Sequence, residues 1–354
     1  MASRAVEHLS VPSFGWGGPE LRARGTDTLC DVSELGVLGF GTVALRLPRL
    51  LREARRLLAE VDARRPAAAL LAGYSEFNGW LGPRLRQRGV RVLWYGAPQV
   101  WAWRPRRARR YSAACDQLAL MLPFEEEIWR SFGAHASYVG HPALEVDWMD
   151  RSRARAELGL GPAPAIALLP GSRSVEVRRH LPVLLGATAR LRARHPDLEA
   201  RVLVASALGA ADRRWLEARA REAHVVPVTT DPVTTLPAYD LALVASGTAT
   251  LECALASVPP VIVYRLPPLS AAVLRRLLQV PQVGLPNLVL HRACFPELLQ
   301  GRLSEAALAA AAQEVLDGRE TYLRACHEVR VRLSRGAPVA PSSRVAEILE
   351  AWLS

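Results

Sequence analysis

The sequence predicts an α/β protein of two doubly wound, Rossmann-like domains that face each other across a cleft. The chain has 354 residues, of which 50% are hydrophobic, so it is long enough for two domains with separate cores. Short apolar runs alternate with longer amphipathic runs, the pattern of parallel strands covered by helices on both faces. Two of the apolar runs end in loops rich in small residues that lead into helix-like segments.

The first half of the chain contains three clear strand candidates. These are the apolar runs at residues 67–72, 90–95 and 117–122. Helix-like stretches at 80–88 and 104–114 separate them, which favours a buried parallel sheet.

The second half repeats this scheme with four strand candidates. They lie at residues 165–169, 200–205, 240–245 and 261–264, with arginine-rich amphipathic helices between them.

The domain boundary is expected after the Gly-His-Pro segment at 140–142, where a polar connection begins. We predict a first domain over 1–150, a second over 151–335 and a C-terminal helix over 336–354.

The net charge of +11 comes from arginine alone, because the sequence contains no lysine. This excludes a Schiff-base lysine and the lysine of a phosphate-binding P-loop. Nucleic-acid binding is the weakest functional class, since the basic residues are dispersed and form no known reader motif.

The cysteines show neither a paired spacing nor a nearby histidine at metal-ligand spacing, so structural zinc is not expected. They are Cys30, Cys115, Cys253, Cys294 and Cys326. The chain begins without a charged-then-apolar leader, so we expect reduced thiols and a cytoplasmic protein. The longest uncharged stretch, residues 277–290, is interrupted by prolines and too short to cross a bilayer core of about 30 Å.

Two strand-to-helix loops carry the chemistry of an anion site. In the loop at 246–252, Gly247 allows close approach of a ligand, Ser246 and Thr248 offer hydroxyl groups, and Glu252 can accept hydrogen bonds from a ribose diol. In the Leu-Pro-Gly-Ser-Arg loop at 169–173, Arg173 supplies a counter-charge. Either loop alone is as well explained by an ordinary turn with Ser or Thr caps. Together, at the carboxyl edge of one sheet, they favour a nucleotide-sugar site.

Seven segments match one family in order and spacing. They are Pro-Gln-Val-Trp-Ala-Trp-Arg at 98–104, Leu-Pro-Phe-Glu at 122–125, Val-Gly-His-Pro at 139–142, the loop at 169–173, the run at 245–252, Leu-Pro-Asn at 285–287 and Pro-Glu-Leu-Leu-Gln at 296–300. From about Phe14 onward, the chain resembles the lipid-A-disaccharide synthase family.

This resemblance implies an inverting glycosyltransferase of the two-domain GT-B type, without metal or other cofactor. The family joins UDP-2,3-diacylglucosamine to 2,3-diacylglucosamine 1-phosphate, giving a β-1,6-linked disaccharide 1-phosphate and UDP. It acts in the cytoplasm as a peripheral protein at the inner face of the bacterial inner membrane. A homodimer is an open alternative to a monomer.

The resemblance also implies further donor-site residues. Asn287 and Gln300 are candidates to bond the uracil or the sugar, although an asparagine after Leu-Pro is as often a turn residue. His141 is a candidate contact to the donor or to a phosphate, with a purely structural role as the alternative.

The chain departs from the family at the expected catalytic base. The family has an aspartate, thought to be the base, where this chain has Gly73. Glu76 matches a second acidic position and is the candidate catalytic residue; its alternative role is a helix-start carboxylate next to Asn78.

The second departure lies at the beginning of the chain. The family starts with a strand and a Gly-Glu-x-Ser-Gly-Asp loop, and nothing similar precedes Phe14. We therefore expect the first sheet to lack a strand and to leave neighbouring strands with unpaired edges. Either the true start codon lies upstream of Met1, or this domain is degraded.

Aromatic and basic residues predict an acceptor or membrane side. Trp101 and Trp103 adjoin Arg104, and the apolar segment at 266–280 contains Arg275 and Arg276. The alternative is that the tryptophans are core residues and the arginines a solvated helix face.

Two further functions compete with an active synthase. One is a weak or inactive paralogue that keeps UDP binding, which Gly73 and the missing strand favour. The other is a different UDP-sugar enzyme of this fold, such as an epimerase or a peptidoglycan-type transferase.

Overall fold

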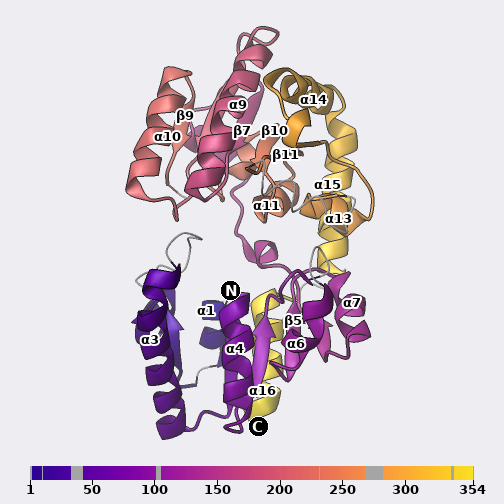
Figure 1. Ribbon diagram of the computed structural model, residues 1–354. Coiled ribbons are helices and arrows are strands. Elements are labelled where there is room, and N and C mark those ends of the chain that lie inside the picture. The colour runs from indigo at the N-terminus through magenta and orange to yellow at the C-terminus, as the bar shows by residue number, and fades with distance from the viewer. Residues whose placement is uncertain are drawn as a thin grey trace. The chain divides into compact units, whose positions relative to one another are not determined.

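The structure is a computed structural model that describes residues 2–9, 11–32, 43–100, 105–230, 232–267, 282–335 and 339–353. The chain forms two compact units, residues 1–142 with 338–354, and residues 143–337. Each unit contains parallel strands and helices, so the predicted α/β class is confirmed (Figure 1). The sequence predicts a boundary at residue 150 and a separate C-terminal helix, whereas the structure divides the units after residue 142 and groups that helix with the first unit.

The described strands of the first unit lie in two parallel sheets. The smaller sheet pairs β1 (Phe14–Gly17) with β2 (Asp27–Asp31). The larger sheet has the order β3-β4-β5-β6, with bounds Ala68–Ala72, Arg91–Tyr95, Gln117–Leu120 and Ala136–Tyr138. Among the described strands, β3 pairs only with β4 and β1 only with β2.

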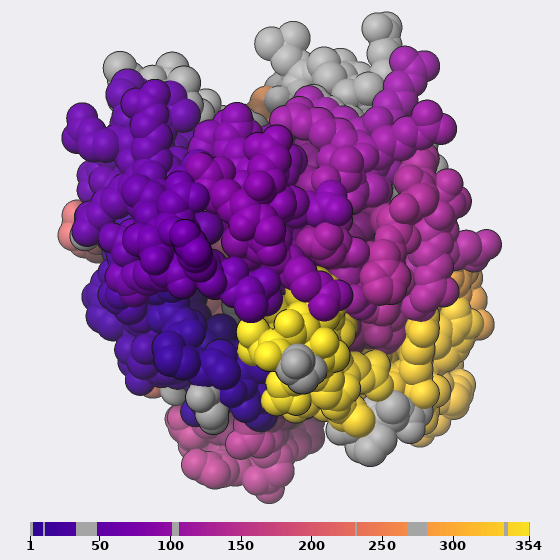
Figure 2. Space-filling model, turned by 90° about the horizontal axis from the view of Figure 1, so that it is seen from below, coloured from indigo at the N-terminus to yellow at the C-terminus, as the bar shows by residue number. Residues whose placement is uncertain are grey.

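Seven helices of the first unit lie in its described residues. They are α1 (Ala2–Leu9), α2 (Pro19–Ala23), α3 (Val43–Arg64), α4 (Ser75–Arg86), α6 (Ala108–Ser112), α7 (Glu125–Ser131) and α16 (Pro341–Leu353), with the 3-10 turns η1 (Pro105–Arg107) and η2 (Pro142–Glu145), the latter running on into the second unit. The last helix, α16, packs beside α1 and against β3 and β4, and Figure 2 shows the yellow C-terminal residues against the indigo N-terminal ones. Arg91 lies 4.3 Å from the ring centroid of Trp352 on α16, which fixes this helix to the sheet.

Helix α4 is held close to the end of β3. The amide of Asn78 donates to the carbonyl oxygens of Ala72 and Gly73, at 3.3 and 2.8 Å. A Cβ added to Gly82 would lie 2.0 Å from a backbone oxygen beyond α6, so only glycine permits this contact. Residues 73–76 therefore have a fixed position at the carboxyl edge of the sheet.

The second unit contains one six-stranded parallel sheet with the order β12-β11-β10-β7-β8-β9. Its strands are β7 (Ala165–Leu169), β8 (Glu199–Leu203), β9 (Val226–Val228), β10 (Leu241–Ala245), β11 (Pro260–Tyr264) and β12 (Glu297–Leu299). Its helices are α8 (Arg151–Glu157), α9 (Ser174–Arg192), α10 (Ala210–Glu222), α11 (Ala249–Leu255), α13 (Leu285–Leu290), α14 (Glu305–Asp317) and α15 (Arg319–Ser334), with the turns η3 (Leu236–Ala238) and η4 (Gln300–Arg302).

The core of the second unit explains why its strands read as continuous apolar runs. Every residue of β7 and β10 is buried. Helices α9, α10 and α14 contribute apolar side chains to the cluster on one face, and α11 packs with α13 and α15. Because β7 and β10 are parallel neighbours, the loops that follow them emerge side by side at the carboxyl edge.

Asp240 fixes the connecting helix α8 to the opposite edge of this sheet. One oxygen of its carboxylate accepts from the Ala165 backbone N–H at 2.9 Å, and the other lies 2.7 Å from the guanidinium of Arg151 on α8. The carboxylate is 15% exposed, so it is shielded from much of the solvent screening that weakens surface ion pairs.

Candidate functional site

Arg173 and the start of α9 form the first part of the site. Gly171 has φ +118°, and a Cβ there would lie 2.7 Å from Glu176, so the turn requires glycine. The Arg173 side chain is 67% exposed, and its guanidinium donates to Glu176 at 2.9 Å. The backbone N–H of Ser172 donates to the other Glu176 oxygen at 3.3 Å. The Glu176 carboxylate thus accepts from the Arg173 guanidinium and the Ser172 N–H, two donors that could otherwise bind an anionic ligand.

The loop after β10 forms the second part. Gly247 has φ +154°, and a Cβ there would meet nothing within 4 Å, so the backbone is open to close approach. Thr248 is exposed. Ser246 instead donates its hydroxyl to the carbonyl oxygen of Val283 at 2.9 Å, which ties this loop to the segment before α13.

Glu252 is a half-buried carboxylate one turn into α11. Burial raises its pKa above the usual range. Within the described part of the chain, no hydrogen bond or ion pair to its carboxylate is recorded, in contrast to Glu176 and Glu297. Glu252 therefore keeps its capacity to accept hydrogen bonds from a ligand.

Asn287, on α13, is completely buried. Its amide nitrogen donates to the Phe295 carbonyl and to Glu297, at 2.9 and 2.8 Å. Its amide oxygen accepts from the backbone N–H groups of Cys294 and Phe295, both at 2.9 Å. These four bonds use every donor and acceptor of the amide. The side chain of Asn287 therefore stabilises the fold at residues 294–297 and has no hydrogen-bonding group left for a ligand.

Gln300 follows the edge strand β12. Its side-chain oxygen accepts from the Leu266 backbone N–H at 3.2 Å. No partner of its side-chain nitrogen is recorded among the described residues, so both amide hydrogens can still be donated.

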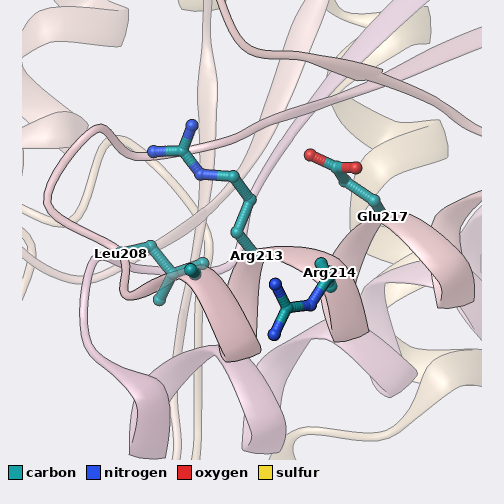
Figure 3. Close-up of a pocket in the computed structure, with 5 residues that line it drawn as sticks. Leu208, Arg213, Arg214 and Glu217 are labelled. Carbon is teal, nitrogen blue, oxygen red and sulfur yellow. The ribbon is translucent and has the colours of Figure 1, made fainter.

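A basic hollow lies beside the neighbouring strand β8, at the start of α10. Its volume is about 380 Å³. Figure 3 shows four of the side chains that line it, Leu208, Arg213, Arg214 and Glu217. Arg213 donates to the Ser206 carbonyl at 3.3 Å, and Arg214 is exposed. These guanidinium groups add positive charge near the strand that adjoins β7.

Glu76 lies at the start of α4 in the first unit and is ion-paired. One carboxylate oxygen accepts from the Arg107 guanidinium and, at 3.1 Å, from the Tyr111 hydroxyl. The Glu76 side chain is 57% exposed. Gly73 has φ +65° with nothing within 4 Å of an added Cβ, so the position of the family's aspartate is open.

His141 follows β6, in the same unit, and is 3% exposed. Burial lowers the pKa of its imidazole to about 4. The ring is therefore neutral at physiological pH and suits an acceptor or a neutral donor more than a phosphate counter-ion.

We expect this burial to make the protein sensitive to acid. A histidine in the unfolded chain titrates near pH ~6.5, so between that value and about 4 the unfolded state binds a proton that the folded state does not. Stability should fall as the pH falls through this window. Urea unfolding at pH 7 and pH 5 should show a smaller loss for His141→Gln than for the wild type. Equal losses would contradict this.

Some predicted site residues lie outside the described ranges. Trp101, Trp103 and Arg104 belong to these, as do residues 268–280 of the apolar segment. Across the described ranges, no group of three or more His, Cys, Asp or Glu side chains is placed to hold a metal ion, and no helix is long and apolar enough to span a membrane.

Solved structures with bound UDP share this fold. The Arabidopsis thaliana UGT89C1 complex with UDP aligns with a TM-score of 0.67 at 13% identity, over 100% of this chain and 95% of that one. The S. aureus MnaA–UDP structure aligns with a TM-score of 0.63 at 13% identity, over 100% and 93%. The two parallel α/β units and these likenesses define a protein of the GT-B fold class.

Sequence comparison identifies the family within this class. The family model described as lipid-A-disaccharide synthetase matches residues 4–341. The lipid-A-disaccharide synthase of Anaeromyxobacter sp. (strain K) is 41% identical over 364 aligned residues, 98% of this chain and 93% of that protein. The enzyme of Myxococcus xanthus is 38% identical over 99% and 93%. The chain belongs to the lipid-A-disaccharide synthase family.

Three residues of the site were not singled out from the sequence. Glu176 acts on its neighbours Ser172 and Arg173, whereas His180 and Glu297 act through contacts with residues farther away in the sequence. Glu176 could have been found as a carboxylate in the first turn of α9, and Glu297 lies inside a recognised motif. The sequence around His180 gives no such signal.

Proposed function

We propose that this chain transfers a diacylglucosamine unit from UDP-2,3-diacylglucosamine to 2,3-diacylglucosamine 1-phosphate. The acceptor 6-hydroxyl attacks the anomeric carbon, the bond to the UDP oxygen breaks, and a base takes the hydroxyl proton. One observation is the main support for donor binding by this chain. Arg173 and the start of α9 lie beside the exposed loop after β10.

This arrangement suits the leaving group. Departure of UDP leaves negative charge on its diphosphate. Arg173 and the Ser172 N–H are placed to stabilise that charge, and the positive end of the 19-residue helix α9 adds to them. Glu176 holds both donors in the free protein, so a diphosphate must compete with its carboxylate.

The nucleoside has candidate partners on helix α11 and at the turn after β12. Glu252 offers an available carboxylate to a ribose diol, and Gln300 offers two amide hydrogens to the uracil or sugar. Thr248 and the open backbone at Gly247 complete the lining toward the phosphates. Asn287 stabilises the segment around Phe295, which precedes Gln300 in the chain.

For the acceptor half we propose Glu76 as the base, with His141 as the second candidate. Glu76 starts the helix that follows β3, at the carboxyl edge where ligands bind in such sheets. Its carboxylate is paired with Arg107 and Tyr111, so an acceptor hydroxyl must compete with these partners. The alternative of a weak or inactive paralogue that keeps UDP binding rests on Gly73, and the relatives that are lipid-A-disaccharide synthases do not favour it.

The direct test supplies purified chain with both lipid substrates. Formation of disaccharide 1-phosphate together with an equal amount of UDP supports the proposed transfer. UDP binding without disaccharide formation favours the inactive paralogue. Interconversion of a UDP-sugar without acceptor favours an epimerase.

We further propose peripheral attachment to the cytoplasmic face of the inner membrane, where both lipid substrates are found. Three exposed arginines on η1 and α6, Arg106, Arg109 and Arg110, directly follow the Trp101–Arg104 segment. Each basic residue near an anionic surface contributes about 1 kcal/mol.

Binding to vesicles should therefore need anionic lipid. We expect sedimentation with phosphatidylglycerol vesicles at 50 mM NaCl, and release at 500 mM NaCl because salt screens exposed charges. Replacing Arg106, Arg109 and Arg110 with glutamine should weaken binding, whereas Arg213→Gln in the other unit serves as the matched control. Binding that ignores both salt and these arginines would overturn the electrostatic part of the proposal.

A further inference from the structure

His180 is a buried ionisable side chain that the proposed reaction does not use. It lies on α9, two turns from the helix start, and is 0% exposed. Its ring centroid is 5.8 Å from that of Tyr264 at the end of β11. The imidazole therefore sits at the carboxyl edge of the sheet, on the face covered by α9.

Both ring nitrogens bond to backbone groups of strand-end loops. Nδ1 lies 2.9 Å from the carbonyl oxygen of Pro170, and Nε2 lies 3.0 Å from the backbone nitrogen of Arg265. A carbonyl oxygen only accepts and a backbone N–H only donates. The two partners therefore require the neutral ring with its hydrogen on Nδ1.

The sheet order gives this pair of bonds its significance. Pro170 follows β7 and Arg265 follows β11, and β10 lies between these two strands. His180 thus joins the two loops on either side of the loop after β10. The next backbone N–H along the chain, that of Leu266, donates to the side-chain oxygen of Gln300. His180 and Gln300 therefore fix two consecutive backbone N–H groups.

The surroundings of the ring favour its neutral form. Burial lowers the pKa of His180, with smaller contributions in the same direction from Arg265 and Arg179. The Pro170 carbonyl and Glu176 oppose this shift. A proton added to Nε2 would point at the Arg265 N–H and break that bond.

We infer that His180 is a positioning residue of the donor site. In its neutral form it sets the separation between the Arg173 loop and the Arg265–Leu266 backbone, and so the width of the space that receives UDP. This inference rests on the proposed donor site. It makes no claim that the imidazole touches the ligand.

Two substitutions separate the two hydrogen bonds. The amide of asparagine reaches the place of Nδ1 and can still donate to Pro170, whereas the amide oxygen of glutamine reaches the place of Nε2 and can accept from Arg265. We expect His180→Asn and His180→Gln each to weaken UDP binding by about 3- to 10-fold, the effect of one lost hydrogen bond. Calorimetry well below the unfolding temperature measures this.

Thr188→Val is the matched control. Thr188 is a buried residue on the same helix, and its hydroxyl donates only within α9, to the Leu184 carbonyl at 2.8 Å. The Thr188→Val substitution should change the thermal midpoint of unfolding without changing UDP affinity. If His180 had only a structural role, its variants would behave in the same way. Unchanged UDP affinity in both His180 variants, with UDP bound by the wild type, therefore overturns the inference but not the proposed function.

The pH dependence of UDP-sugar affinity provides a second measurement. With UDP-N-acetylglucosamine, whose diphosphate does not titrate near neutrality, wild-type affinity should stay level near neutrality. It should fall only as the pH approaches the lowered pKa of His180, below the ordinary imidazole value of ~6.5. Where His180→Asn folds, its lower affinity should approach that of the wild type as the pH falls. A decline of the same size in His180→Asn or His180→Gln, which have no imidazole at this position, overturns the inference. Absence of wild-type UDP binding overturns both the inference and the proposed donor site.

Discussion

Arg173→Ala should weaken UDP binding by about 10- to 150-fold, which corresponds to roughly 1.5–3 kcal/mol for lost charge-assisted hydrogen bonds. The guanidinium is 67% exposed at the start of α9, so it is free to turn toward a diphosphate. Its removal also leaves Glu176 without its counter-ion beside the site. Calorimetric titration with UDP measures the sum of both effects.

A double-mutant cycle separates these effects. Glu176→Gln removes the internal anion while keeping the shape of the side chain, so it should partly restore UDP binding in the Arg173→Ala background. Arg190→Ala is the matched control, because Arg190 lies near the other end of α9, where its guanidinium faces Glu305 at 3.6 Å. Unchanged UDP affinity in Arg173→Ala would remove the main support for the donor site.

Glu76→Gln should lower turnover by about 100-fold if the chain is active and Glu76 is the base, since an alcohol attacks efficiently only as its proton is removed. The amide keeps the shape and can still accept from Arg107 and Tyr111. UDP binding should not change, because Arg173 and its loop lie in the other unit. The rate of disaccharide formation at saturating substrates is the measurement.

Gly73→Asp distinguishes a relocated base from a lapsed enzyme. The position has room for a side chain, and aspartate tolerates its φ of +65° better than most residues. Activity gained only in Gly73→Asp supports an enzyme that has lost its base. Full activity in Glu76→Gln contradicts the assignment of Glu76 as the base and leaves His141 as the next candidate. Glu60→Gln, at an exposed ion pair on α3, is the control.

Most of the strands could be predicted because each is a local apolar run. Residues 165–169 form β7 as expected, and the ends of β3, β4 and β10 at residues 72, 95 and 245 also agree. The strands β1, β2, β9 and β12, of three to five residues each, were not predicted. So few residues do not show a periodic pattern, and pairing with neighbours decides whether they form strands.

The sequence by itself determined the fold class, the two strand-end loops and the residues Arg173, Gly247 and Glu252, because apolar runs, glycines and charges at loops are local signals. The tertiary structure alone decided the long-range contacts of the site. It uses the whole amide of Asn287 inside the fold, and places His180 between two loops 95 residues apart in sequence, from Pro170 to Arg265. The order of strands in the sheet brings those loops together, and no local pattern of residues encodes that order.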